Sequence, residues 1–355
     1  MGALKRKERV TLLVAVAATL AAGVLDATGA TPLLIFVIAA VGLATLASIV
    51  GDATEQLGAR LSPGATGVLQ SALGNLPELF VGVFALRAGL VKVVQAALIG
   101  SILSNSLLVL GLALLSGGLR HGTQKFASDQ PKMIATLMFL ATAALTVPTL
   151  AQTLHTPAEA HEEALGIACA IVLLAVFAAS IPVSIQGGPT TVTKTHAASE
   201  EGHWPIGLTV ALLAGAGIGA AFVSDWFVAA LTPAIQALHI SEAFAGLVVV
   251  AIAGNAVENV VGIQLALDNK PDYAISVILN SSLQVALALT PVLVLLSFVI
   301  GGTHLTLVLP PLLVAAVALA TLSSNFIVFD GESVWMEGVA LVGLYIILAA
   351  SFWWG

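Results

Sequence analysis

The sequence predicts an all-α polytopic membrane protein with about eleven transmembrane helices, arranged as one N-terminal helix and two inverted five-helix repeats. Three observations predict this fold: an apolar composition, a series of long apolar segments, and a polar motif that occurs twice. Of the 355 residues, 59% are hydrophobic and 9% are charged, whereas soluble domains contain about 25% charged residues. A soluble fold of this size cannot bury so much apolar surface, so we expect the chain to lie in a lipid bilayer.

Eleven apolar segments each approach the ~20 residues that a helix needs to cross the hydrocarbon core. Unpaired backbone groups are not tolerated in lipid, so runs of this length are expected to be helical. The first segment follows a basic stretch, as in a signal peptide, but the apolar segments continue to the end of the chain and favour a transmembrane helix. The predicted spans are 9–26, 32–58, 64–87, 91–117, 131–154, 159–186, 205–231, 241–267, 271–301, 304–328 and 332–354.

Lysine and arginine are distributed unequally between the loops that connect these spans. If the N-terminus is cytoplasmic, only Arg87 and Lys92 fall outside and the other ten fall inside, as the positive-inside rule requires. The sequence therefore predicts a cytoplasmic N-terminus and an external C-terminus. The ten cytoplasmic residues are Lys5, Arg6, Lys7, Arg9, Arg60, Arg120, Lys125, Lys132, Lys194 and Lys270.

The repeat is visible as a motif that recurs after 180 residues, since GNLPE at 74–78 corresponds to GNAVE at 254–258. In the same register, Ser101 corresponds to Ser281. Each repeat would contain five spans, an odd number, so the second repeat would be inverted in the membrane; inverted repeats with interrupted helices are typical of secondary transporters. The predicted division is 1–31 for the N-terminal helix, 32–186 for the first repeat, 187–204 for a cytoplasmic linker and 205–355 for the second repeat.

Glu78 and Glu258 are carboxylates inside apolar segments, where a lone charge is costly. Such a group has two natural states: it is neutral when protonated and anionic when it holds a metal ion. Two of them facing each other at the midplane would exchange one divalent cation for protons, which is the chemistry of an antiporter. A single buried glutamate can instead cap a helix or pair with an arginine, but repetition in register favours a cation site.

The residues around the glutamates favour a hard cation. Gly74, Asn75 and Pro77 weaken the helix before Glu78 and free backbone carbonyls, and Gly254 and Asn255 do the same more weakly before Glu258. Together with amide oxygens and the two carboxylates, these carbonyls approach the six to eight oxygen ligands that Ca²⁺ takes. No cysteine or histidine lies in either motif, which disfavours zinc and copper. The predicted metal-site residues are Glu78, Glu258, Asn75, Asn255, Gly74 and Gly254.

The span after each glutamate carries a second polar motif, GSILSN at 100–105 and NSSLQ at 280–284. We expect its side chains to ligate the cation or to orient the glutamates; the alternative is that they only hydrogen-bond neighbouring helices together. Together with Pro77, the residues concerned are Ser101, Ser104, Asn105, Ser281, Ser282 and Gln284.

The span before each glutamate also contains acids. Asp52 and Glu55 are three residues apart and so share one helix face, and Asp225 occupies the corresponding region of the second repeat. These residues are predicted to line a proton or cation access path. The alternative is that they are interfacial carboxylates near helix ends.

The segments that begin at Gly74 and Gly254 resemble the two α-repeats of the calcium/proton exchangers, the CAX branch of the calcium/cation antiporter superfamily. The resemblance covers spans two to eleven and rests on the Gly-Asn-x-x-Glu pair, GSILSN and Ser-Ser-x-Gln. It implies an eleven-helix fold, export of Ca²⁺ in exchange for H⁺ by alternating access, and Ca²⁺ bound between Glu78 and Glu258. Backbone oxygens around Gly74 and Gly254 would help, and the family also implies a homo-oligomer, a trimer in some bacterial members.

The motifs depart from the family pattern at several positions. Leu76 and Pro77 replace the usual Ala-Thr, and the Pro-Glu pair resembles the sodium/calcium exchanger branch. Asn259 stands where histidine often follows the second glutamate, and Asn280 stands where glycine usually precedes Ser-Ser. These departures bear on cation selectivity more than on the fold.

The predicted function is secondary-active antiport in a prokaryotic plasma membrane. Ca²⁺ and H⁺ are the predicted substrates, with other divalent cations as alternatives to Ca²⁺, and the bilayer is the predicted environment. No nucleophile–base set is evident, so an enzyme is not predicted; neither is a cofactor or a nucleic-acid partner. The alternatives are a Na⁺/Ca²⁺ exchanger and a cation channel that uses the glutamates as a selectivity ring.

Overall fold

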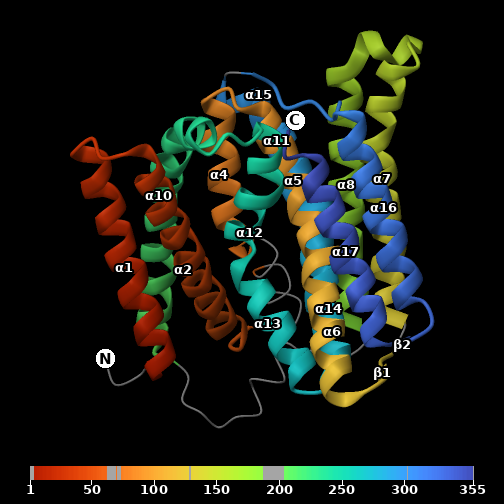
Figure 1. Ribbon diagram of the computed structural model, residues 1–355, viewed down its shortest axis with the longest axis horizontal. Coiled ribbons are helices and arrows are strands. Elements are labelled where there is room, and N and C mark those ends of the chain that lie inside the picture. Colours follow the sequence, from red (N-terminus) through yellow and green to blue (C-terminus); the bar gives the residue numbers. More distant parts are fainter. Residues whose placement is uncertain are drawn as a thin grey trace. The chain divides into compact units, whose positions relative to one another are not determined.

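The computed structural model shows a chain built almost entirely from long helices (Figure 1). It describes residues 4–61, 69, 73–127, 129–186, 204–301 and 303–354, without the side chains of 182–186, 257 and 258. Within this part of the chain, eight helices are long and apolar enough to cross a membrane, or nine if one bent pair counts as a single span. The predicted all-α membrane fold is confirmed. The predicted linker 187–204 lies outside the described residues, except for Trp204.

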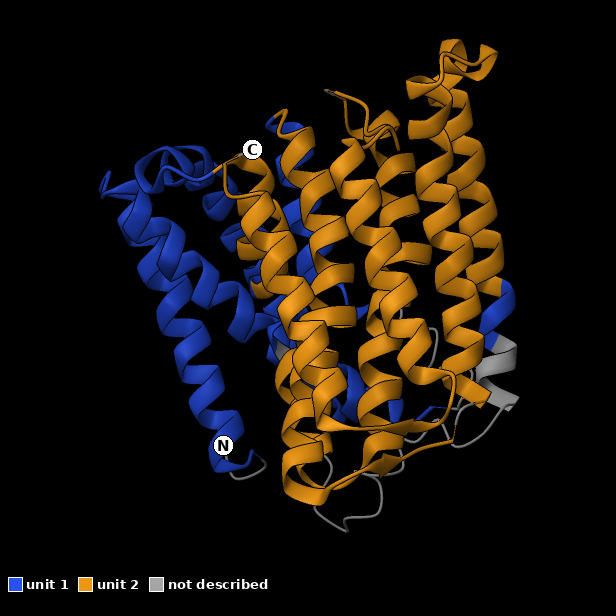
Figure 2. Ribbon diagram, turned by 45° about the vertical axis from the view of Figure 1, so that its right-hand side comes forward, with its two compact units in different colours: residues 1–88, 179–240, 253–257 blue, residues 89–178, 241–252, 258–355 orange. Residues whose placement is uncertain are grey.

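The chain divides into two compact units, which Figure 2 shows in different colours. Each unit contains helices from both predicted repeats, so neither predicted repeat forms a body by itself. Unit 1 comprises Met1–Ala88, Ala179–Ile240 and Ala253–Val257, and unit 2 comprises Gly89–Ala178, Ser241–Ile252 and Glu258–Gly355.

In unit 1, the long helices α2 and α10 pack closely because small residues let their backbones approach. An added Cβ at Gly42 would lie 3.2 Å from Val223, and one at Gly219 would lie 3.2 Å from Leu46. The helices assigned wholly to this unit are α1 (Arg6–Ala27), α2 (Pro32–Gly58), α4 (Leu76–Arg87) and α10 (Ile206–Leu238).

Trp204 joins the start of α10 to α1 and α2. Its side chain is 3% exposed. The indole N–H donates to Oε2 of Glu8 at 3.2 Å, and the backbone N–H donates to Oε1 of Gln56 at 3.1 Å. Arg60 donates to the carbonyl of the same residue. The last residue of the predicted linker is therefore a buried structural anchor.

Unit 2 contains two spans that each combine α-helix with a π-helical turn, η1 in the first and η4 in the second. A π turn has i→i+5 hydrogen bonds and frequently marks a functional site. The first span consists of α5 (Val91–Leu103), η1 (Ser104–Val109) and α6 (Leu110–His121). The second consists of α14 (Pro271–Gln284), η4 (Val285–Leu289) and α15 (Thr290–Ile300).

The other elements lie wholly or largely in unit 2, except α12, which is divided equally between the units, and they include a short two-stranded sheet. Lys125 on β1 and Glu332 on β2 form an ion pair at 2.7 Å, and this hydrogen bond raises the pKa of Lys125. The elements are α7 (Asp129–Thr153), η2 (Pro157–His161), α8 (Glu162–Gln186), α11 (Glu242–Phe244), η3 (Ala245–Val250), α12 (Ala251–Gly254), α13 (Ala256–Leu267), α16 (Pro311–Val328), α17 (Trp335–Ser351), β1 (Gln124–Lys125) and β2 (Glu332–Ser333).

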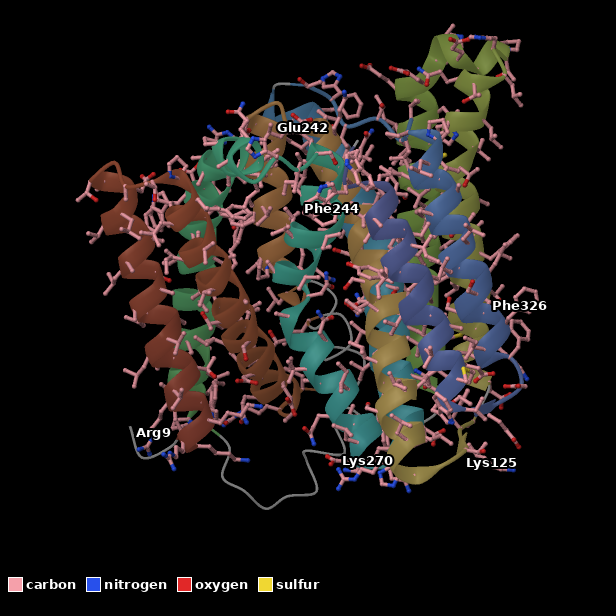
Figure 3. All side chains as sticks on the ribbon, in the orientation of Figure 1. Arg9, Lys125, Glu242, Phe244, Lys270 and Phe326 are labelled. Atoms are coloured by element: carbon pink, nitrogen blue, oxygen red, sulfur yellow. The ribbon has the colours of Figure 1, made fainter. Side chains whose placement is uncertain are left out.

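Charged residues mark the two ends of unit 2. Lys125 and Lys270 lie at one end and Glu242 lies at the opposite end (Figure 3). Both lysines were predicted to be cytoplasmic; the orientation of the chain in the membrane stays a prediction. Between the ends, apolar side chains such as Phe326, which is 78% exposed, point outward, as expected for a surface that faces lipid.

One predicted span contains the break that its motif predicts, and another begins later than predicted. The predicted span 241–267 is a broken helix, because its parts Glu242–Gly254 and Asn259–Leu267 meet at 62°. The predicted span 304–328 begins too early, because α16 starts only at Pro311. Residues 303–310 have no helical structure.

The 303–310 segment is held between helices of unit 2 by hydrogen bonds from side chains rather than by the regular backbone hydrogen bonds of a helix or sheet. Leu305, Leu307 and Leu309 are at most 4% exposed. Gln95 on α5 donates through Nε2 to the carbonyls of Thr306 and Val308, both at 3.0 Å. A buried polar side chain thus satisfies backbone carbonyls that lipid would leave unpaired.

Replacing Gln95 with leucine is expected to lower the apparent melting temperature of the detergent-purified protein. The substitution leaves two partly buried carbonyls without their donor, and an unsatisfied buried group costs about 1–3 kcal/mol. The matched control is Gln264→Leu, because Gln264 is exposed and its side-chain amide donates to Asp268 at the surface. Equal melting temperatures for Gln95→Leu and the control would contradict this role.

Candidate functional site

The first motif forms the start of helix α4. Asn75 is the N-cap residue and is 7% exposed, and its carbonyl accepts the N–H of Leu79 at 3.0 Å. Pro77 occupies the first turn, where its missing N–H costs no helical bond. Glu78 is the third residue of α4 and lies at the positive end of the helix dipole. The local sequence therefore breaks the span directly before the glutamate.

The second motif repeats this arrangement. Helix α12 ends at Gly254, Asn255 is fully buried between the two helices, and α13 begins at Ala256. Glu258 is thus the third residue of α13, as Glu78 is of α4. The side chain of Glu258 lies outside the described part of the structure. The predicted interruption of the helix is present at both motifs.

Within unit 1, the two motifs meet through Glu78 and Gly254. A Cβ added to Gly254 would lie 2.8 Å from Cγ of Glu78, 3.1 Å from Oε1 and 3.2 Å from Cδ. These distances are shorter than normal contacts, so the glutamate side chain occupies the space that only a glycine leaves. Two residues that are 176 positions apart in sequence are therefore in direct contact at the predicted site.

Within unit 2, the two second motifs are joined by side-chain hydrogen bonds. Nδ2 of Asn105 donates to Oγ of Ser281 at 3.0 Å, and the hydroxyls of Ser106 and Ser282 are 3.0 Å apart. All four residues are at most 7% exposed. Asn105 and Ser106 lie in the π turn η1. The structure thus connects three of the predicted residues and adds Ser106.

The remaining predicted residues are distributed over both units. Ser101 and Ser104 are buried on the α5–η1 span, whereas Gln284, at the end of α14, is partly buried. Asp52 and Glu55 are partly buried on α2, and Asp225 on α10 is exposed and lines a cavity with apolar residues. Their predicted part in a proton or cation path stays a prediction.

Among the described side chains, no three His, Cys, Asp or Glu residues lie close enough to form a metal site. The predicted site contains only two carboxylates, and one of them belongs to Glu258. The other oxygens of the predicted site come from amides, hydroxyls and backbone carbonyls, which suit Ca²⁺.

Sequence reasoning missed two residues that this geometry brings forward, Ser106 and Gln95. Ser106 directly follows GSILSN, but its counterpart in the second repeat is Ala286, so the repeat gave no signal for it. Gln95 is a lone amide in the apolar segment VVQAALIG, and the cost of burying an unpaired amide was the available signal.

Comparison with known proteins places the chain among membrane exchangers. The family model described as "Sodium/calcium exchanger protein" matches residues 31–186 and 208–354. The chain is 33% identical over 336 residues to the "Ca(2+)/H(+) antiporter" of Synechocystis sp., with 90% of each chain covered. It is 34% identical over 325 residues to the "Ca(2+)/H(+) antiporter ChaA" of Bacillus subtilis, covering 90% of this chain and 91% of the relative.

Solved structures show the same fold. "Structure of native YfkE" is 29% identical with a TM-score of 0.82 and covers 97% of this chain and 99% of that chain. "Crystal Structure of H+/Ca2+ Exchanger CAX" is 18% identical with a TM-score of 0.77, covering 98% of this chain and 92% of that chain. A sodium-calcium exchanger, NCX_Mj, gives a TM-score of 0.55 at 20% identity, covering 89% of this chain and 99% of that chain. The last two comparisons bear on the fold alone.

The broken helices, the duplicated Gly-Asn-x-x-Glu motif and these similarities confirm the predicted resemblance to the calcium/cation antiporters: the chain belongs to the sodium/calcium exchanger protein family.

Proposed function

We propose that this chain is a secondary-active antiporter that exports Ca²⁺ from the cytoplasm in exchange for H⁺. The observation that carries the proposal is the contact between Glu78 and Gly254, because it brings a carboxylate of one motif against the backbone of the other within interrupted helices. Interrupted helices of this kind bind ions in secondary transporters. Relatives named Ca²⁺/H⁺ antiporters support protons as the exchanged ion.

In this proposal, Glu78 and Glu258 bind either one Ca²⁺ or protons. Asn75, Asn255 and the backbone of Gly74 and Gly254 add oxygens to the cation. The bonds Asn105–Ser281 and Ser106–Ser282 hold the two second motifs together within unit 2. Supporting roles are further proposed for Ser101, Ser104, Gln284 and Pro77, and Asp52, Glu55 and Asp225 are proposed to line the route by which protons or cations enter.

The proposed architecture is an N-terminal helix and two inverted five-helix repeats, giving eleven spans. The π turns η1 and η4 lie at corresponding positions of the two repeats and support this layout. The proposed location is a bacterial plasma membrane with a cytoplasmic N-terminus and an external C-terminus. A homo-oligomer, in the form of a trimer, is part of the same proposal.

The test is radioactive calcium uptake into sodium-free proteoliposomes under an imposed pH gradient. Uphill uptake that follows the gradient is expected, and it collapses when a protonophore equalises the pH. Uptake that runs only downhill and ignores the pH gradient would indicate a channel instead and would contradict the proposal.

Uptake is expected to be insensitive to membrane voltage if Glu78 and Glu258 are the only groups that titrate. One Ca²⁺ then exchanges for two protons, and no net charge crosses the membrane. The measurement compares initial rates at several potassium diffusion potentials with valinomycin at fixed pH gradient. A steep voltage dependence would show that another number of protons is carried.

The second candidate is Na⁺/Ca²⁺ exchange, because the family model carries that name and Pro77–Glu78 resembles that branch. A sodium gradient at equal pH on both sides distinguishes the two. Calcium uptake driven by sodium under these conditions would favour the second candidate, whereas its absence together with proton-driven uptake supports the first.

A further inference from the structure

A cavity of about 670 Å³ lies within unit 1 between α4 and α10. Its size falls in the range of small-ligand sites, about 300–1,000 Å³. Eleven of its twelve lining residues are apolar, and the twelfth is Asp225. Phe80 and Phe84 contribute from α4, and Gly217 and Ala221 contribute small side chains from α10. We call this cavity the α4–α10 groove.

The walls of the groove disfavour water as the occupant. An ordered water needs about two to four polar partners, and among the lining residues that the structure describes Asp225 supplies the only polar side chain. Both helices belong to a membrane protein, and Phe222 and Ile218 at the groove are 59% and 62% exposed. The medium available to such a surface is hydrocarbon.

The dimensions of the groove match one lipid chain. Its lining on α10 runs from Val210 to Asp225, a separation of fifteen residue steps, which corresponds to about 22 Å of helix. A hydrocarbon core of about 30 Å gives each leaflet about 15 Å. A chain from a single leaflet therefore has room to lie along the groove.

The polar end of the groove lies where a headgroup is expected. Trp226, next to Asp225, packs against Gly23, so closely that an added Cβ there would lie 2.8 Å from its ring. Gly23 is four residues before the end of α1 at Ala27, where the apolar run stops. Tryptophan is enriched at this boundary. The groove is thus charged at the membrane boundary and apolar in its interior, which is the polarity of a lipid.

The geometry points to a phospholipid site: one acyl chain occupies the α4–α10 groove, and an ammonium-bearing headgroup pairs with Asp225. The acyl chain contacts Leu76, which lies two residues before Glu78, and so supports the first turn of α4. The inference depends on the membrane location of the chain and not on which ions are exchanged. It assigns Asp225 to the lipid headgroup in place of the entry route proposed above, and the reagent test below decides between the two roles.

The test uses the protein in vesicles that contain phosphatidylethanolamine with a photoreactive diazirine in its acyl chain. Adducts are expected on the lining residues of α4 and α10. Ala221→Phe fills the groove and is expected to abolish them, whereas Ala211→Phe, at an exposed position of the same helix outside the lining, preserves them. Adducts that avoid the groove, or that persist in Ala221→Phe, would overturn the site.

A second measurement separates lipid from water in the groove. In a Cys169→Ser background, Ala221→Cys is expected to resist a charged methanethiosulfonate in the folded protein, because the reactive thiolate does not form in hydrocarbon, and to react rapidly once the protein is denatured. Rapid reaction with the charged reagent would overturn the lipid site and would support an aqueous path to Asp225. The headgroup contact is tested separately with Asp225→Asn, which is expected to remove the preference for ethanolamine over glycerol probes; an unchanged ratio would overturn that contact.

Discussion

Glu78→Gln is expected to abolish proton-driven calcium uptake. Glutamine keeps the size of the side chain but removes its charge and its ability to exchange a proton. Loss of one carboxylate from a buried cation site costs about 3 kcal/mol, which corresponds to roughly a hundredfold weaker Ca²⁺ binding. The measurement is initial uptake rate against Ca²⁺ concentration under a fixed pH gradient.

The variant also separates binding from folding. Glu78 is in the first turn of α4, and glutamine is accepted there at little helical cost. The melting temperature and the oligomeric state are therefore expected to stay close to those of the wild type. Glu258→Gln is expected to give the same loss because it is the third residue of α13. Wild-type uptake in either variant would contradict the proposed pair.

The control is Glu242→Gln. Glu242 lies in the first turn of α11, at the end of unit 2 opposite Lys125 and Lys270 (Figure 3). The substitution Glu242→Gln therefore makes the same chemical change outside the site. Its uptake is expected to match the wild type within about twofold, since exposed charges contribute about 0–1 kcal/mol.

The sequence was sufficient to predict the helical membrane fold and both helix breaks. Gly-Asn before each glutamate, with Pro77 in the first motif, opposes a continuous helix, and this preference is local. Composition and span length likewise depend only on nearby residues. These parts of the prediction needed no knowledge of how helices pack.

The contacts inside the units depended on packing and could not be predicted in the same way. The repeated motif predicted that Glu78 and Gly254 belong to one site, but no pattern in the sequence indicates that the Glu78 side chain fills the space at Gly254, or that Ser106 bonds to Ser282 across 176 positions. The 303–310 segment is apolar enough to be taken for a helix, but its backbone groups bond to the side chains of Gln95, Thr149 and Ser297 instead of to one another, and its leucines are buried. Hydropathy indicates that a segment is buried. It does not distinguish a helix, whose backbone groups bond to one another, from an irregular segment whose backbone groups bond to side chains.

Gly254→Ala is expected to impair transport strongly while leaving the fold intact. The new methyl group would lie 2.8 Å from Cγ of Glu78, and that side chain is flexible, so it moves and the backbone does not. The displaced carboxylate is expected to raise the Ca²⁺ concentration for half-maximal uptake about tenfold, equivalent to about 1.4 kcal/mol. The melting temperature is expected to change little, because alanine is otherwise favourable in a helix.

A graded series tests whether the carboxylate position is the cause. Gly254→Val adds more volume at the same place and is expected to weaken Ca²⁺ uptake further than alanine does. Gly215→Ala on α10 and Gly343→Ala on α17 are matched controls, since nothing lies within 4 Å of an added Cβ at either position. If Gly254→Ala loses uptake and melting temperature together, the glycine serves packing alone. If uptake falls while the melting temperature holds, the empty space at Gly254 is what positions Glu78 for the cation.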